Sequence, residues 1–293
     1  MKVMKGYKGF NKSMHCLDKQ YAENTTFLEK GADSCCQAGV MHFCKDPIDV
    51  FRYYPPVDRF GNHNEYAEVE ALGTIHEGNR KCAADTLKIG EKITLDNYII
   101  EAIAQAKESV YPSDPDAAKN HVLSNSKPFV SSYFANNDHN AVILEREIDD
   151  RIADVGDNTV IASLGLGTTI AVAGSVNHIY SNGYDANIAS SGRNSIIVTE
   201  SADSSIASNG TQSRVVCNGD NSVAAAIGKW SWAKGKIGNW IVLAEYYEDE
   251  ESHYSIKCVK AAQIDGVNLM PDTFYELKNG EFVAVEIPEE DGD

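Results

Sequence analysis

The sequence predicts a mainly β protein, in which a small α+β N-terminal domain precedes a parallel β-solenoid and a C-terminal β cap. Glycine recurs every nine residues from Gly156 to Gly228, with Ser201 in place of one glycine. Five residues after each of these positions stands an isoleucine or, in the last repeats, a valine or an alanine. The same phase runs back to Ile143. A β-branched residue repeated every nine positions fits stacked strands and no helical period. We therefore predict a two-sheet β-roll over residues 141–236.

The interior of this roll is predicted to be thin. Two positions after each isoleucine the residue is mostly small or hydroxylated, as in the pair Ile179 and Ser181. Alternate residues of a strand share a face, so both members of each pair should point inward. The glycine is expected at the corner of each repeat, where a positive φ suits it.

The outward positions differ between alternate repeats. Repeats that begin at 156, 174, 192 and 210 carry bulky, mostly apolar residues, and we call their strands the odd-repeat sheet. The intervening repeats carry small or polar residues, such as Thr169, Asn187 and Ser205, and form the even-repeat sheet. A period of nine in the core and eighteen on the surface predicts two strands, or about 18 residues, per coil.

An apolar sheet face of this size should be covered by another protein surface. The covering surface could be the N-terminal domain or a second copy of the chain. The predicted interaction face consists of Val160, Tyr180, Ile196, Val198 and Val216.

Calcium-binding rolls also use nonapeptide repeats, but GGxGxD turns supply their carboxylate ligands. Turns such as GLGTT and GSVNH lack the paired glycines and the regular aspartates. We therefore expect no calcium.

The segments on either side of the roll complete the predicted domain organisation. Residues 1–95 form the α+β domain, with strands at 2–10, 40–44, 66–71 and 87–95 and an amphipathic turn at 47–54. Residues 96–140 hold a helix, over 96–110, and a linker. Residues 237–293 form the cap, which covers an otherwise open sheet edge and ends in an acidic tail. In its last hairpin, Asn279 and Gly280 predict a type I′ turn.

The charge balance narrows the choice of partners. The chain has 26 Lys and Arg residues and 43 Asp and Glu residues, so its net charge is −17. Such a field repels phosphate backbones and anionic lipid, so neither nucleic acid nor a membrane is expected as a partner. The sequence has seven cysteines, no secretory signal pattern and no run of ~18 apolar residues. Free thiols and a cytoplasmic location are expected.

Possible metal ligands gather near the N-terminus. Cys16, Cys36, His42 and Cys44 offer three thiolates and one imidazole, which could hold zinc tetrahedrally. Their spacing lacks paired CxxC motifs, and a buried cysteine also packs as a small apolar residue. We therefore expect no metal and no other cofactor. A nucleophilic Cys–His pair drawn from the same residues is the alternative.

The N-terminal segments occur in the order YKGF, GVMHF, residues 49–54 and YAEVE. This order resembles the opening of ADP-ribosyltransferase-type domains. The resemblance implies a dinucleotide cleft lined by Lys8, His42, Tyr53, Tyr54, Glu68 and Glu70. The chain departs from that family in having lysine where arginine or histidine is usual, no STS triplet, and no late glutamate. An ordinary α+β domain is the alternative.

Longer motifs extend over most of the chain. KGYKGFNKSMHC, GVMHFCKDPIDVFRYYPP and YAEVEALG precede the SSIASNG-type repeats, and NWIVLAEYYED and DTFYELKNGEFV follow them. In this order they resemble an uncharacterised family of phage and bacterial proteins classed as a domain of unknown function. The resemblance implies a phage or prophage setting, hence an infected or lysogenic bacterial host, and brings no activity.

The function expected from the sequence is therefore a non-enzymatic interaction or scaffold protein. In this role the solenoid presents or oligomerises the N-terminal domain. The alternative function is an ADP-ribosyltransferase-like or nucleotide-binding N-terminal domain, which bound NAD near His42 and Tyr54 would favour.

Overall fold

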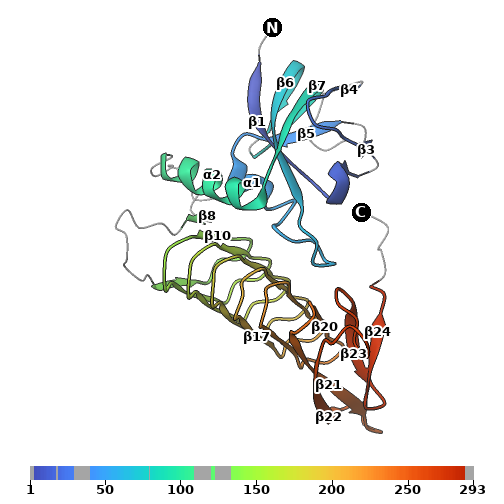
Figure 1. Ribbon diagram of the computed structural model, residues 1–293. Helices are drawn as coiled ribbons and strands as arrows, with labels where there is room; N and C mark the ends of the chain where they lie inside the picture. The colour runs from blue at the N-terminus through green and yellow to red at the C-terminus, as the bar shows by residue number, and fades with distance from the viewer. Residues whose placement is uncertain are drawn as a thin grey trace. The chain divides into compact units, whose positions relative to one another are not determined.

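The computed structural model describes residues 3–17, 19–29, 40–78, 80–108, 120–122 and 133–287. The chain divides into two compact units (Figure 1). The first comprises Met1–Asp58 and Asn62–Val122, and the second comprises Arg59–Gly61 and Leu123–Asp291. In the described ranges no helix has the length and apolar character that a bilayer crossing requires.

The first unit is a small antiparallel sheet with two helices. Its strands are β1 (Met4–Phe10), β2 (His15–Cys16), β3 (Lys19–Gln20), β4 (Thr26–Leu28), β5 (Met41–Cys44), β6 (Glu65–Glu77) and β7 (Lys81–Ile93). Its helices are α1 (Pro47–Val50) and α2 (Leu95–Glu108), with a 3-10 turn at Lys12–Met14. The predicted strands and helix are all present, and β6 extends beyond its predicted end.

Pairing closes the sheet of the first unit on itself. Strand β1 pairs with β5 and β6, and β7 pairs with β4, β5 and β6. The 13-residue strands β6 and β7 bend enough to do this because their register shifts twice, between Ala67 and Val69 and between Leu72 and Ile75. Such irregularities increase the local twist and let a strand contact different partners along its length.

The two faces of this sheet have different environments. Inner side chains, among them Phe10, Phe43 and Val69, form an apolar core. On the other face Tyr66 stacks on Tyr98 of α2, with ring centroids 4.3 Å apart. Because residues alternate along a strand, each position of β1 and β6 can be assigned to one face.

The second unit is the predicted parallel solenoid, seen as stacked coils in Figure 1. The odd-repeat sheet of this unit contains β10 (Val142–Glu145), β12 (Val160–Ser163), β14 (His178–Ser181), β16 (Ile196–Thr199), β18 (Arg214–Cys217) and β20 (Trp232–Gly235). The even-repeat sheet contains β9 (Tyr133–Asn136), β11 (Arg151–Asp154), β13 (Thr169–Val172), β15 (Asn187–Ser190), β17 (Ser205–Ser208), β19 (Val223–Ala226) and β21 (Trp240–Glu248). Ile161 pairs with Ile179 and Ile170 with Ile188, which confirms a coil of 18 residues. The isoleucines form one buried core, as predicted.

The solenoid begins before the predicted boundary at residue 141. Strand β9 is parallel to β11, and Phe134 pairs with Ile152 in the isoleucine position. The sequence hid this strand because Phe134 stands where the later repeats have isoleucine.

The prediction that the repeat glycines have positive φ is wrong. A Cβ on Gly183 would stand 1.6 Å from the carbonyl oxygen of Gly165, one coil earlier, without any positive φ at Gly183. Positive φ falls two residues later in each repeat, mostly on asparagine or aspartate, which tolerate it. Examples are Asn158, Asp185, Asn194, Asp203 and Asn221. The glycine is therefore needed for the close approach of neighbouring coils.

A C-terminal cap is present, but β21, which lies within the range predicted for it, is parallel to β19 and belongs to the last coil. Strand β22 (Tyr254–Gln263) pairs antiparallel with β21, and the hairpin of β23 (Phe274–Lys278) and β24 (Glu281–Val285) joins the sheet at β20. Positive φ at both Asn279 (53°) and Gly280 (75°) confirms the type I′ turn. Trp240 pairs with Val223, so the last coil is one residue shorter than the others.

The first coils have a polar interior. Glu145 is fully buried and accepts a hydrogen bond from Oγ of Ser163 at 2.7 Å. Asp154, also buried, accepts one from Nδ2 of Asn136 at 2.6 Å. Burial, and then the neighbouring Asp150, raises the pKa of Glu145 to about 9. Glu145 is therefore protonated in the folded protein at neutral pH.

Candidate functional site

A buried lysine in the first unit has unusual surroundings. Lys8 lies on β1 opposite Ala67, on the inner face of the sheet, and is only 4% exposed. Its Nζ donates a hydrogen bond to the carbonyl oxygen of His42 at 2.9 Å. The same atom lies 4.9 Å from the ring centroid of Tyr21 and 5.5 Å from that of Phe10. Burial lowers the pKa of Lys8, because a desolvated ammonium is less stable than a hydrated one.

Cys16 completes the surroundings of this amine. Its Sγ lies 3.3 Å from Nζ of Lys8, and the hydroxyl of Tyr54 donates to the same sulfur at 3.0 Å. Burial raises the pKa of Tyr54, so this hydroxyl keeps its proton and stays a donor. Cys16 is itself partly exposed. The sulfur therefore accepts two hydrogen bonds in a residue that is only partly buried.

Local backbone geometry brings Cys16 back over Lys8. Ser13 and Met14 both have positive φ, so the chain reverses between β1 and β2. The Met14 amide donates to the carboxylate of Glu65 at 2.7 Å, which fixes this reversal against β6. Tyr54 follows α1 and lies against Gly9. A Cβ added to Gly9 would stand only 2.5 Å from the Cβ of Tyr54. Gly9 thus leaves the space that Tyr54 occupies.

The structure divides the six residues proposed for a dinucleotide cleft. Lys8 and Tyr54 both contact Cys16, and the carbonyl group of His42 contacts the Lys8 amine. Glu68 and Glu70 alternate with the core residue Val69 and so lie on the opposite face of β6, where Glu70 pairs with Lys88 at 3.1 Å.

Tyr53 has a separate, more exposed position. Its side chain is 48% exposed, and Nζ of Lys81 lies 5.1 Å from its ring centroid. Tyr53 thus forms no part of the group around Cys16.

The residues proposed as zinc ligands are also divided. Cys16 packs at the edge of the inner core. His42 and Cys44 alternate with the core residues Met41 and Phe43 on β5, so they occupy the other face. Burial raises the pKa of Cys44 to about 12, which keeps it a thiol.

Cys36 falls outside the described residues. Within the described ranges, no three His, Cys, Asp or Glu side chains gather as metal ligands would.

The zinc hypothesis grouped Cys16 with Cys36, His42 and Cys44 and missed its contact with Lys8. The sequence did contain a sign that Lys8 is buried, because its neighbours Tyr7, Gly9 and Phe10 are residues that suit burial. The chain reversal through Ser13 and Met14, which creates the contact, has no sequence signature of its own.

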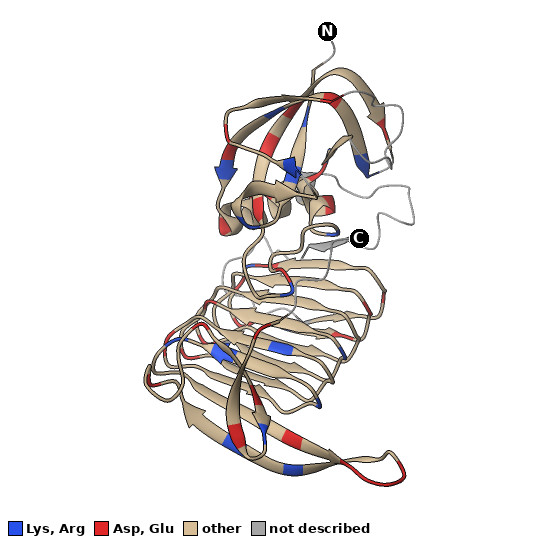
Figure 2. Cartoon of the chain, turned by 90° about the vertical axis from the view of Figure 1, so that its right-hand side faces the viewer, with Lys and Arg blue, Asp and Glu red and all other residues tan. Residues whose placement is uncertain are grey.

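The outer faces of the solenoid sheets form a second candidate surface. All five residues of the predicted interaction face on the odd-repeat sheet are buried: Val160, Tyr180, Ile196, Val198 and Val216. On the even-repeat sheet, Thr169, Asn187 and Ser205 are exposed. Most acidic residues of the solenoid lie at its corners (Figure 2).

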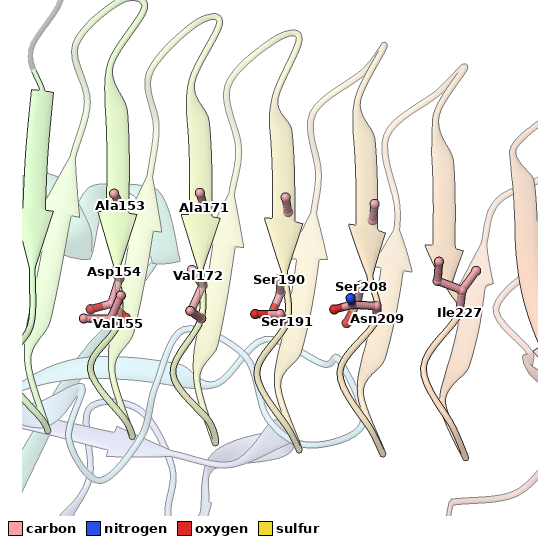
Figure 3. Close-up of a pocket in the computed structure, with 13 residues that line it drawn as sticks. Ala153, Asp154, Val155, Ala171, Val172, Ser190, Ser191, Ser208, Asn209 and Ile227 are labelled. Carbon is pink, nitrogen blue, oxygen red and sulfur yellow. The ribbon is translucent and has the colours of Figure 1, made fainter. Parts of the chain in front are cut away.

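The even-repeat sheet carries a long hollow of about 550 Å³. Its floor is a row of outward alanines one coil apart, Ala153, Ala171, Ala189 and Ala207, which Figure 3 shows from β11 to β17. Residues at the ends of these strands, such as Ser191, Asn209 and Ile227, line its side. The hollow is thus a shallow groove with few polar groups.

Comparison with known proteins gives one match. Residues 4–101 match the family model described as a domain of unknown function (DUF7666). This confirms, for that part of the chain, the resemblance to an uncharacterised domain family. No curated protein and no solved structure matched the chain.

Proposed function

We propose that this chain is a non-enzymatic interaction or scaffold protein whose solenoid presents or oligomerises the N-terminal domain. The proposed setting is the cytoplasm of a phage-infected or lysogenic bacterium. The contrast between the outer faces of the two solenoid sheets carries the proposal.

Within one solenoid, the outward side chains of the two sheets differ in size according to whether they are buried or exposed. Val198 and Val216 of the odd-repeat sheet are fully buried, although they point away from the solenoid core. At equivalent positions the even-repeat sheet has the exposed alanines Ala189 and Ala207. Large apolar side chains are retained where they are removed from water, because their burial contributes roughly 25 cal/mol per Å². The odd-repeat sheet therefore has the composition of a contact surface.

A contact in the second unit supports this interpretation. Gly61 groups with the solenoid, and a Cβ at this residue would stand 2.8 Å from Cγ2 of Val216. A protein backbone therefore lies directly against the odd-repeat sheet.

The alternative nucleotide-binding function needs a cleft in which the basic and acidic residues converge. Lys8 lies on the inner face of the N-terminal sheet, and Glu68 and Glu70 lie on the outer face. This separation favours the interaction role over the alternative.

The test compares two double variants in adjacent strands. Ile196→Lys with Val198→Glu places charges on the outer face of β16, and Asn187→Lys with Ala189→Glu makes matching changes on β15. We expect only the β16 variant to lose mass in light scattering, or to become faster to cleave by limited proteolysis between α2 and β9. Circular dichroism should show that both variants keep their strands.

Equal behaviour of the two variants in both assays would remove the support for a contact surface. A melting temperature raised by NAD in the parent protein, but not in a Tyr54→Phe variant, would favour the nucleotide-binding alternative.

A further inference from the structure

Lys8 is a buried cation whose nearest potential counter-charge is a sulfur. The ionisable groups that act most strongly on it are Cys16, Cys44 and Lys81. A buried charge is costly unless it is paired, and Cys16 is the one of these that hydrogen-bonds to the amine. The pair can exist as ammonium and thiolate or as amine and thiol. The nitrogen and the sulfur are 3.3 Å apart in the structure.

We propose that Cys16 is a hydroperoxide-reactive thiol whose oxidised sulfur is captured by Lys8 in a covalent sulfur–nitrogen bond. This goes beyond the proposed scaffold role and does not depend on it. The substrate class is a small hydroperoxide, which supplies the oxidising equivalents.

The first step is attack of the Cys16 thiolate on the terminal oxygen of the peroxide. An S–O bond forms, the O–O bond breaks, and the sulfur is oxidised to sulfenic acid. The leaving alkoxide or hydroxide takes a proton from the Lys8 ammonium and departs as alcohol or water. Hydrogen bonds from Lys8 and Tyr54 stabilise the thiolate before the attack.

The second step joins the two residues. The Lys8 amine, now neutral, attacks the sulfenic sulfur, so that an S–N bond forms and hydroxide leaves with an amine proton as water. In sum, thiolate, ammonium and hydroperoxide give a sulfenamide, an alcohol and water. Sulfenic acids are known to condense with nitrogen nucleophiles in this way. An excess of small thiol reverses the step, giving back the amine and the thiol together with a disulfide of the reductant.

The surroundings of the other described cysteines make Cys16 the favoured site. Cys44, Cys82 and Cys217 are buried. Cys258 is partly exposed like Cys16, but its Sγ lies 3.6 Å from the carboxylate of Glu245 rather than beside an ammonium. Cys258 therefore has no amine beside its sulfur in the described contacts, and it is a matched control within the same chain.

The experiment treats the full chain with hydrogen peroxide near neutral pH and maps its peptides by mass spectrometry. We expect a peptide pair linked through Lys8 and Cys16, lighter than the unlinked pair by two hydrogen atoms and separated again by dithiothreitol. Dimedone, which traps sulfenic acid, should label Cys16 at least about tenfold faster than Cys258. Dimedone present from the start should suppress the linked peptide.

Two variants separate the steps. Lys8→Arg keeps a donor and a positive charge but lacks the amine, so it should accumulate dimedone-labelled Cys16 without the link. Cys258→Ser should leave the link unchanged.

The measurements on the parent protein decide the matter even if Lys8→Arg does not fold. Absence of the linked peptide while Cys16 advances to sulfinic acid would overturn the proposal. Equal labelling of Cys16 and Cys258 would overturn it as well.

Discussion

Ile179 pairs with Ile161 in the neighbouring strand of the odd-repeat sheet, and both side chains are fully buried. The substitution Ile179→Asp places a carboxylate in this stack of isoleucines. We expect destabilisation by at least about 4 kcal/mol, because a buried charge without a partner is among the largest penalties that a fold can incur. Urea unfolding followed by circular dichroism measures the loss. Asn187→Asp, on an exposed position, is the control and should unfold close to the parent midpoint.

Glu145 makes the stability of the solenoid depend on pH. Its folded pKa of about 9 lies above the reference value of 4.5. Between these two pH values the folded state binds more protons than the unfolded state. The stabilisation that Glu145 gives to the fold is therefore complete below about pH 4.5 and is lost as the pH rises through 9. Glu145→Gln removes this loss and should stabilise the protein at pH 7 by up to roughly 3 kcal/mol.

Urea midpoints at several pH values test this prediction for Glu145. The parent midpoint should fall toward alkaline pH more steeply than that of the Glu145→Gln variant. Glu147→Gln, in the adjacent corner, should keep the parental slope. Parallel pH profiles for the parent and Glu145→Gln would show that the buried carboxyl group does not control alkaline stability.

The repeat glycines should tolerate a methyl group poorly. In Gly183→Ala the new Cβ meets the carbonyl oxygen of Gly165 in the preceding coil. Ser201 occupies the same position in another coil, so we expect the substitution to destabilise the fold by about 2 kcal/mol or more rather than to abolish it. Asp185→Gly, at a corner residue with φ of 57°, should cost less, because glycine adopts this conformation readily. Thermal melts that rank the two variants in the opposite order would contradict this explanation of the glycines.

Glu245 ties the cap hairpin to β21. Its carboxylate accepts Nζ of Lys257 at 2.8 Å and the backbone amides of Asn279 at 3.0 Å and Gly280 at 2.8 Å. The Lys257 bond contributes most to lowering the pKa of Glu245 to about 2. A depressed pKa stabilises the fold above the reference value of 4.5, and this contribution disappears as pH falls toward 2.

Hydrogen exchange tests the role of Glu245. In Glu245→Ala we expect faster exchange of the Asn279 and Gly280 amides, since both lose their acceptor. In the control Glu248→Ala, which removes only a contact with the Tyr254 hydroxyl, these two amides should exchange at the parental rate.

The solenoid could be predicted from the sequence because its pattern is local and repeated. Ile161 and Ile179 occupy the same phase, so one repeat predicts the next, and the stacking follows from strand geometry. The role of glycine could not be read in the same way, because both a turn and a close contact favour glycine. Only the distance between neighbouring coils in the structure distinguishes a turn that requires glycine from a close contact that requires it.

The N-terminal site depends on contacts between distant segments. Lys8 meets the carbonyl group of His42 because β1 pairs with β5, and it meets Cys16 because the chain reverses after β1. Strand patterns predicted β1 and β5 but not their order in the sheet. Proximity in the sequence therefore suggested the wrong neighbours for Cys16.

The buried acids of the first coils imply a direction of unfolding. Coils that contact only their neighbours behave as a linear array, in which opening propagates from a weak end. The C-terminal coil is held by two antiparallel hairpins. Near the other end, Glu145 and Asp154 replace the small uncharged side chains found further along the inner row. Under denaturant or mechanical load the array should therefore unzip from its first coils toward its last, and it should do so more readily as the solution becomes alkaline.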